Sequence, residues 1–140
     1  MQAKDLMTQN PEIISPETTL KQAAEKMRDQ DIGFLPVGEN DRLIGAITDR
    51  DIVIRGLAAG KDPKTLTVRD VMTDEIRYCM ENDDLEKVAG MMSKLQIRRL
   101  VVLNDDKRIV GVVSLGDVAT KSQDNQLTGK VTEDVSESSK

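Results

Sequence analysis

The chain carries one pattern twice, and this internal repeat constrains its fold more than any local signal. The segment Asp5-Leu6-Met7-Thr8 returns as Asp70-Val71-Met72-Thr73, 65 residues later. The spacing Gly-x-x-Thr-x-x-Asp that begins at Gly45 returns as Gly-x-x-Ser-x-x-Asp from Gly111, 66 residues later. Such self-similarity indicates two copies of one supersecondary unit. Because the chain has only 140 residues, we expect the copies to share one core, with a cleft between them that suits a ligand.

The composition excludes several classes of function. A net charge of −5 and a total of one Phe, one Tyr and no Trp argue against binding of nucleic acid. No apolar run approaches the ~20 residues of a membrane span and no N-terminal signal is visible, so we expect a soluble cytoplasmic protein without membrane contact. The absence of His and the single Cys79 exclude the usual zinc sites and the Ser-His or Cys-His nucleophiles. We therefore predict no catalytic residue, no metal site and no enzyme activity.

The periodicity predicts an α/β (α+β) chain in which each repeat reads helix, strand, helix, strand, strand, helix. An apolar stripe with i, i+3, i+4, i+7 spacing predicts a helix from Leu20 to Met27 and another from Leu85 to Met92. Thr18 or Thr19 is expected to cap the first of these helices, and Asp83 with Glu86 to form a capping box on the second. The other elements are predicted as a short strand at 12–14 and another around Tyr78, hairpins at 34–48 and 100–114, and helices at 49–56 and 115–120.

The same reading sets the predicted domain bounds. The first repeat is placed at residues 4–57, a Gly- and Pro-containing loop at 58–66 and the second repeat at 67–121. The polar composition from Ser122 onward predicts that residues 122–140 form a disordered tail.

The strongest candidate site is the pair Thr48/Asp51 together with its copy Ser114/Asp117. Each hydroxyl ends a strand and begins a helix, with the carboxylate three residues on, which is the pattern of a simple capping box. The alternative is a nucleoside phosphate site, in which free N–H groups and the hydroxyl meet a phosphate and the Asp accepts from ribose hydroxyls. The recurrence favours the second interpretation, because a cap does not require the glycine that precedes each box, Gly45 and Gly111, whereas a flat base approaching the backbone does.

These motifs together resemble the cystathionine-β-synthase-type (CBS) domain, and two in tandem resemble a Bateman module of the small stand-alone bacterial kind. The resemblance rests on Asp-Val-Met-Thr, Leu-x-x-Ala-x-x-x-Met, Ile-x-x-Leu-Pro-Val and Gly-x-x-Thr-x-x-Asp, and it covers residues 4–120. It implies two βαββα repeats packed through their sheets about a pseudo-twofold axis. It also implies adenine nucleotides (AMP, ADP or ATP) in the clefts, with S-adenosylmethionine or NAD-type ligands less favoured, and a homodimer that forms a disc of four repeats.

Carried over by position, the resemblance assigns ligand contacts in both repeats. Asp51 and Asp117 would hold ribose hydroxyls, and Thr48 and Ser114 would meet ribose or phosphate. The base would be enclosed by the apolar strand residues Ile13, Ile14 and Pro36, with Tyr78 and Cys79 as the matching region of the second repeat.

The repeats are not equivalent in charge. Arg98-Arg99 stands where the first repeat has Gly33-Phe34, and Val101 stands where it has Pro36. These arginines suit a phosphate tail through forked hydrogen bonds, or else form ion pairs at the strand end near Asp105 and Asp106. We therefore expect two sites of unequal affinity. Mg²⁺ is expected only together with a bound polyphosphate, held by Asp49, Asp51 or Asp117.

Three functions remain in order of preference. The first is a sensor module that binds an adenine nucleotide and changes the shape of a dimer or the docking of an effector protein. The second is a structural or dimerisation module whose boxes are only caps. The third, an enzyme acting on nucleotides, lacks any paired carboxylates with the spacing of a general acid and base.

Overall fold

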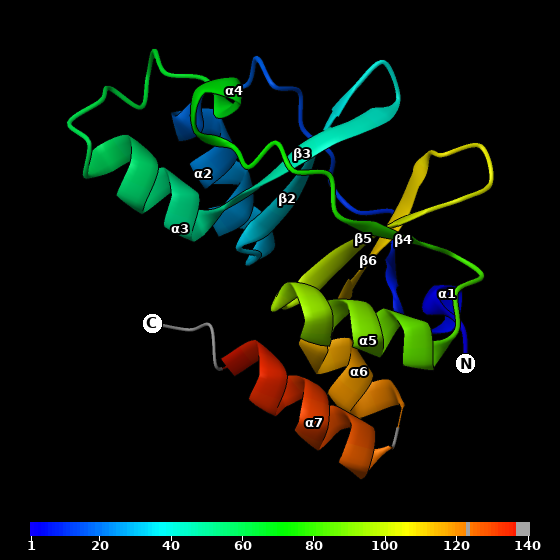
Figure 1. The fold of residues 1–140 in the computed structure, drawn as a ribbon. Helices are drawn as coiled ribbons and strands as arrows, with labels where there is room; N and C mark the ends of the chain where they lie inside the picture. Colours follow the sequence, from blue (N-terminus) through cyan, green and yellow to red (C-terminus); the bar gives the residue numbers. More distant parts are fainter. Residues whose placement is uncertain (123, 137–140) are drawn as a thin grey trace. The chain divides into compact units, whose positions relative to one another are not determined.

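The computed structural model describes residues 1–122 and 124–136, which fold into two compact α+β units (Figure 1). Unit 1 consists of Met1–Pro11 and Arg77–Lys140, and unit 2 consists of Glu12–Ile76. The units therefore do not coincide with the two sequence repeats. The first eleven residues of the chain belong to the unit that holds most of the second repeat, and the residues that follow the inter-repeat loop belong to the unit built on the first.

Unit 1 is built on a four-stranded sheet. Its strands are β1 (Thr8–Gln9), β4 (Tyr78–Met80), β5 (Arg99–Leu103) and β6 (Ile109–Ser114), in the order β1-β6-β5-β4. β5 and β6 form the predicted antiparallel hairpin, β1 is antiparallel to β6, and β4 is parallel to β5.

Unit 2 repeats this sheet in reduced form. β2 (Phe34–Glu39) and β3 (Arg42–Thr48) form an antiparallel hairpin. Single bridges join Ile14 to Val37 in parallel and Thr73 to Ala46 in antiparallel orientation. These bridges occupy the same register as Cys79–Val102 and Thr8–Val112 in unit 1. The strand predicted at 12–14 is thus one bridge at Ile14, because Pro11 and Pro16 close to it lack the N–H groups that a longer ladder needs.

Two helices of unit 2 begin at hydroxyl caps. α2 (Leu20–Gln30) is capped by Thr19, whose Oγ1 accepts from the Gln22 N–H at 3.1 Å. α3 (Asp49–Asp51) begins after Thr48 and continues without a break as the π-helical segment η1 (Ile52–Leu57). The short helix α4 (Val68–Val71) completes the unit.

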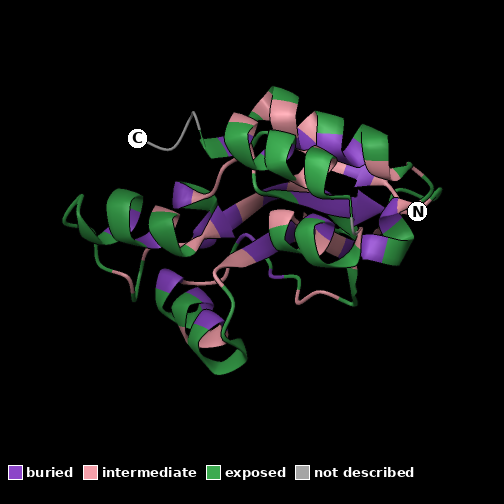
Figure 2. Ribbon diagram, turned by 90° about the horizontal axis from the view of Figure 1, so that it is seen from below, coloured by how far each residue is buried: buried purple, intermediate pink, exposed green. Residues whose placement is uncertain are grey.

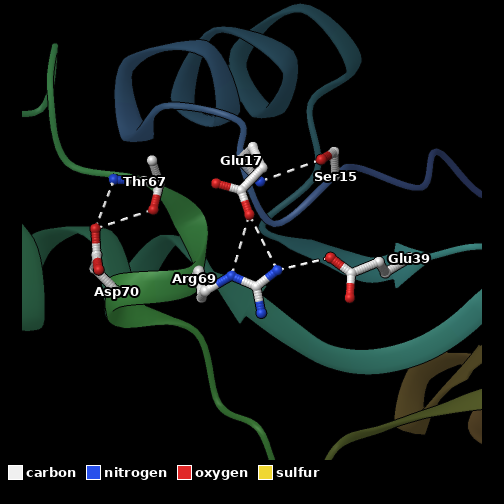
Figure 3. Close-up of polar contacts among 6 residues, drawn as sticks. All are labelled: Ser15, Glu17, Glu39, Thr67, Arg69 and Asp70. Carbon is white, nitrogen blue, oxygen red and sulfur yellow. Dashed lines mark hydrogen bonds and ion pairs between the residues drawn. The ribbon is translucent and has the colours of Figure 1, made fainter.

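An exposed ion-pair cluster ties α4 to the rest of unit 2 (Figure 3). The Nη2 atom of Arg69 lies 3.0 Å from Glu17 Oε1 and 2.7 Å from Glu39 Oε2. Hydrogen bonds to these two carboxylates raise the pKa of Arg69 further above its ordinary value, and the bond to Glu17 has the larger effect. In the same view Asp70 accepts hydrogen bonds from the N–H and the hydroxyl of Thr67, both at 3.0 Å.

Unit 1 contains α1 (Ala3–Leu6), α5 (Leu85–Leu95) and α6 (Leu115–Lys121). The prediction that Asp83 caps α5 is wrong by one residue. Asp84 is the cap, with its Oδ1 accepting from the Lys87 N–H at 2.8 Å. Asp83 instead accepts the Met80 N–H at 2.8 Å and closes the turn after β4.

The C-terminal segment contains a helix where disorder was predicted. α7 (Asn125–Ser136) packs against α5 and α6, and Figure 1 shows it in orange and red beside both. Leu127, Val131 and Val135, spaced by four residues, form its apolar stripe, and the two valines are buried. Three apolar side chains on one face therefore order a segment whose overall composition is polar. Residue 123 and residues 137–140 of the predicted tail lie outside the described residues.

Each unit has its own hydrophobic core. Buried residues line the helix faces that meet each sheet (Figure 2). The unit 1 core includes Leu6, Met92, Leu100, Val113 and Val118. The unit 2 core includes Leu20, Met27, Leu35, Ile47 and Val71. Leu6 belongs to the first repeat and Val71 to the second, so each core is completed by a residue from the start of the other repeat. We call the segments that carry these residues, Met1–Pro11 and residues 67–76, the exchanged segments.

Candidate ligand-binding sites

The first candidate site lies at the end of the β2–β3 hairpin in unit 2. The Thr48 Oγ1 atom accepts the Asp51 N–H at 3.1 Å, and Asp51 Oδ2 accepts the Thr48 N–H at 3.0 Å. Thr48 has extended backbone angles, which place its side chain over the first turn of α3. The carboxylate of Asp51 is only 15% exposed, and its Oδ1 lies 3.9 Å from Arg55 Nε.

Unit 1 reproduces this geometry at the end of the β5–β6 hairpin. The Ser114 Oγ atom accepts the Asp117 N–H at 3.0 Å, and Asp117 Oδ2 accepts the Ser114 N–H at 2.9 Å. The Asp117 side chain is 17% exposed, and its Oδ1 lies 3.4 Å from Lys121 Nζ. We call each hydroxyl–carboxylate pair a box: the unit 2 box is Thr48/Asp51 and the unit 1 box is Ser114/Asp117.

Both boxes are genuine helix caps, as the structural interpretation of the pattern required. In unit 2 the N–H groups of the first helical turn also have partners. The Asp49 N–H donates to the Gly33 carbonyl at 3.0 Å, and the Arg50 N–H donates to Asp49 Oδ1 at 2.8 Å. The free N–H donors expected to receive a phosphate are thus occupied at this helix start. What each box leaves available is the hydrogen of its hydroxyl and the Oδ1 atom of its carboxylate.

The glycines that precede the boxes have a packing role. A Cβ on Gly45 would lie 2.4 Å from the carbonyl oxygen of Thr73, and a Cβ on Gly111 would lie 2.3 Å from Met7 Sδ and 2.9 Å from the Thr8 carbonyl. Both glycines therefore let the exchanged segment lie directly against the hairpin. This contact explains a glycine in each repeat without a ligand, and it removes the sequence argument that the glycines favour nucleotide binding over capping.

The predicted base-enclosing residues differ in how far they are buried. Ile14 and Cys79 are buried in the two cores, and Pro36 is also buried. Burial raises the pKa of the Cys79 thiol to about 12, which makes it a packing residue at neutral pH. Ile13, which is 43% exposed, and the half-buried Tyr78 occupy equivalent positions, next to those core residues. Of the residues predicted here, these two remain accessible.

Arg98 and Arg99 lie next to the unit 1 box through the backbone. Arg99 pairs directly with Ser114 across the hairpin, and the Arg98 carbonyl accepts the Leu115 N–H at 2.8 Å. The candidate site residues therefore fall into two groups. Unit 2 gathers Ile13, Ile14, Pro36, Gly45, Thr48 and Asp51, whereas unit 1 gathers Tyr78, Cys79, Arg98, Arg99, Gly111, Ser114 and Asp117.

Arg55 and Lys121 take part in this geometry, and neither is among the site residues predicted from the sequence. Arg55 Nη1 donates to the carbonyl of Val71 at 3.3 Å, and Lys121 Nζ donates to the carbonyl of Leu6 at 2.9 Å. Each basic side chain thus joins a box to the end of an exchanged helix. The signal was present in the sequence, since a basic residue follows each box Asp by four positions in both repeats.

Within residues 1–122 and 124–136, no group of three or more His, Cys, Asp or Glu side chains is placed to hold a metal ion. In the same residues, no helix has both the length and the apolar character needed to cross a bilayer.

Comparison with known proteins gives matches over most of the chain. The family model for the CBS domain matches residues 3–57 and 68–124. Hypoxic response protein 1 of Mycobacterium tuberculosis is 42% identical over 118 residues, which is 84% of this chain and 82% of that protein. The CBS domain-containing protein YhcV of Bacillus subtilis is 38% identical over 133 residues, which is 95% of this chain and 94% of that protein. A homoserine O-acetyltransferase of Methanobrevibacter ruminantium is 36% identical, but the match covers only 23% of its length.

Three solved structures are similar to this chain over most of its length. The crystal structure of Hypoxic Response Protein I with two coordinated zinc ions has a TM-score of 0.76 and 42% identity, and the match covers 85% of this chain and 97% of that chain. The CBS domain pair of MJ0100, in complex with 5′-methylthioadenosine and S-adenosyl-L-methionine, has a TM-score of 0.76 and 28% identity. The match covers 85% of this chain and 97% of that chain. CBSX2 in complex with AMP has a TM-score of 0.73 and 25% identity, and the match covers 86% of this chain and 95% of that chain.

Proposed function

This chain belongs to the CBS domain family as a tandem pair, and on that premise we propose that it is a regulatory module that binds an adenosine-type ligand at its two boxes. The observation that carries the proposal is the Oδ1 atom of each box Asp. It stands beside a basic side chain in both units, while Oδ2 alone closes the cap. A carboxylate oxygen with lone pairs to spare is suited to accept the two hydroxyls of a ribose.

The other ligand contacts follow from what the structure leaves accessible. The hydroxyls of Thr48 and Ser114 accept one hydrogen bond each and keep their own hydrogen for a ligand oxygen. Ile13 and Tyr78 are the proposed contacts for the base. We propose AMP, ADP or ATP, followed by S-adenosylmethionine and NAD-type ligands, with Mg²⁺ only where a polyphosphate is bound. Zinc is not among the proposed ligands, because this chain has no His and its only Cys is buried.

The readout of ligand binding is proposed to be a change in self-association or in docking of an effector protein. Unit 2 offers a surface for a second copy, since Val53, Ile54 and Leu57 of η1 are each about half exposed. In unit 1 the first two matching positions are Ala119 and Thr120, and α7 packs against the helix that carries them. A homodimer would therefore form through η1 of unit 2. Sedimentation of Leu57→Asp should show a monomer, and an unchanged dimer would place the interface elsewhere.

A thermal-shift and calorimetric panel tests ligand binding. Adenosine, AMP, ATP and S-adenosylmethionine are titrated into the unaltered chain and into the Asp51→Asn and Asp117→Asn variants. Ligand at about 100 times its dissociation constant should add about 2.7 kcal/mol to the free energy of unfolding. We expect this stabilisation in the unaltered chain, a weaker effect in each variant, and none in the double variant.

The matched control is Asp70→Asn. Asp70 closes a third box with Thr67 at the start of α4, with the same Asp Oδ2 to N–H distance of 3.0 Å, but away from the hairpin ends. It should lower stability like the other two variants and leave ligand binding unchanged.

The second candidate function is a structural or dimerisation module without a ligand. It is favoured by a specific observation, the fully formed caps and the packing role of Gly45 and Gly111. If no adenosine ligand stabilises the chain, and the box variants lose only about 1 kcal/mol each, this second function is correct.

A further inference from the structure

Opposite each box hydroxyl, across the hairpin, lies a residue of different chemistry. Phe34 pairs with Thr48 in unit 2, and Arg99 pairs with Ser114 in unit 1. Residues directly opposite one another in an antiparallel pair share a face, with their Cβ atoms about 5 Å apart. A ligand held at a box would therefore lie near a phenylalanine in unit 2 and near an arginine in unit 1.

The positions just before these residues extend the contrast. The two backbones are equivalent, because the Asp49 N–H donates to the Gly33 carbonyl at 3.0 Å and the Leu115 N–H donates to the Arg98 carbonyl at 2.8 Å. The side chains are not equivalent. A Cβ on Gly33 would lie 2.6 Å from Asp49 Oδ2, so a carboxylate occupies the space in which a side chain at 33 would begin. Unit 1 has no carboxylate there, because Leu115 replaces Asp49, and it has Arg98 in place of the glycine.

The formal charges of the two sites differ accordingly. Residues 33–34 and 48–55 of unit 2 carry two acidic and two basic side chains, a net charge of zero. The matching residues 98–99 and 114–121 of unit 1 carry one acidic and three basic side chains, a net charge of +2. Two unit charges close to a bound phosphate change its affinity substantially, and salt screens this effect.

We propose that the two boxes select adenosine ligands by charge. The unit 1 box takes a phosphorylated, anionic ligand, with Arg98 and Arg99 as the specificity residues. The unit 2 box takes an uncharged or cationic adenosine derivative. The ring of Phe34 is apolar and its face attracts cations, and the carboxylate of Asp49 repels phosphate. This inference rests on the proposed function, and it makes the chain a sensor of two chemically different ligands.

The test uses two probes of opposite character on the full chain, AMP and 5′-methylthioadenosine, measured by isothermal titration. Asp117→Asn should remove AMP binding and keep binding of 5′-methylthioadenosine, whereas Asp51→Asn should do the reverse. The Arg98→Gly/Arg99→Phe variant, which gives unit 1 the residues of unit 2, should weaken AMP at least tenfold. AMP binding should also weaken with added salt, while binding of 5′-methylthioadenosine should not. Asp70→Asn again serves as the control.

The outcomes separate this inference from the proposed function. If both probes bind but the same box variant removes both, or if each box binds both equally, charge selection is wrong while adenosine binding stands. If neither probe binds to the unaltered chain, the proposed function fails and this inference fails with it. Should the double arginine variant not fold, as judged by its circular dichroism, the two single Asp variants decide the question alone.

Discussion

Lys121 Nζ lies 2.9 Å from the carbonyl oxygen of Leu6, although 115 positions separate the two residues in the chain. The same nitrogen lies 3.4 Å from Asp117 Oδ1, so one ammonium group joins the unit 1 box to the end of α1. Arg55 makes the matching connection in unit 2, from Asp51 to Val71. The box, the basic residue and the exchanged helix thus form one connected arrangement in each unit.

Replacement of Lys121 by Met should lower the free energy of unfolding by about 1 kcal/mol. A charged hydrogen bond to a carbonyl contributes more than this when buried, but the side chain of Lys121 is 41% exposed and solvent weakens the interaction. Urea unfolding measures the loss. Lys130→Met is the control, because the Lys130 side chain is 73% exposed and its ion pair with Asp134, at 3.4 Å, joins two residues of the same helix. This variant should change stability by less than about 0.5 kcal/mol. Equal losses in the two variants would contradict a specific role of Lys121.

Gly45→Ala should destabilise the chain by about 2 kcal/mol, because the new Cβ would meet a backbone oxygen that cannot move independently. Gly90→Ala should have the opposite sign. Gly90 lies inside α5, and a Cβ there would meet nothing within 4 Å beyond the nearby backbone of its own helix, so alanine gains about 0.5–1 kcal/mol of helix stability. Thermal unfolding of the two variants compares them. A neutral Gly45→Ala would mean that the segment around Thr73 does not lie against β3.

Val131→Ala tests whether α7 is a folded part of unit 1. Removal of two buried methyl groups should lower the free energy of unfolding by about 2 kcal/mol. The neighbouring Thr132 is exposed, and Thr132→Ala should be neutral or slightly stabilising because alanine is the better helix former. Denaturant unfolding measures both variants. If neither variant changes the free energy of unfolding, α7 does not pack against unit 1 and the predicted disorder of this segment is correct.

Cys79 should resist thiol reagents in the native protein. Burial raises its pKa to about 12, so almost no thiolate exists at pH 8, and the side chain is 2% exposed. Absorbance during labelling with a disulfide reagent should remain flat and rise only when denaturant unfolds the chain. Rapid labelling at pH 8 without denaturant would show that β4 opens locally.

Asp70 should contribute to the acid sensitivity of unit 2. The Thr67 N–H, and then the Thr67 hydroxyl, hold the pKa of Asp70 below its ordinary value of 3.8. A lowered folded-state pKa means that this stabilisation is complete above the unfolded pKa and is lost as the pH falls through the folded pKa. Asp70→Asn should therefore be less stable than the unaltered chain at pH 7, and the difference should shrink below pH 4. A difference independent of pH, measured by urea unfolding at pH 7, 4 and 2.5, would contradict this linkage.

The elements that the sequence predicts well are those governed by local periodicity. The stripe from Leu20 to Met27 and its copy from Leu85 to Met92 lie on α2 and α5 as expected, because a single buried face repeats every three or four residues. Adjacent Asp83 and Asp84 could not be ranked as caps, since each is a competent cap and the turn after β4 decides between them. In α7 the three apolar residues were too widely spaced among polar ones to stand out.

The long-range features could not be predicted for a different reason. The pairing of Thr8 with Val112 involves a two-residue strand, which carries no periodic signal of its own. The boxes were found from the repeat alone, but capping and ligand binding require the same residues at the same spacing. Gly45 illustrates the limit most clearly, because its role depends on the Thr73 carbonyl, which no sequence pattern places beside it.

The exchange of segments between units also orders events during synthesis. Residues 12–76 are complete as a unit when little more than half of the chain has emerged. Met1–Pro11 leave the ribosome first, but their backbone partners are residues 81–85 and then β6, which are synthesised later. Joining residues 1–11 to the C-terminal end of the chain would make both units contiguous. Such a circular permutant would convert an interleaved pair into two consecutive domains, and its refolding should no longer depend on the slowest loop closure in the chain.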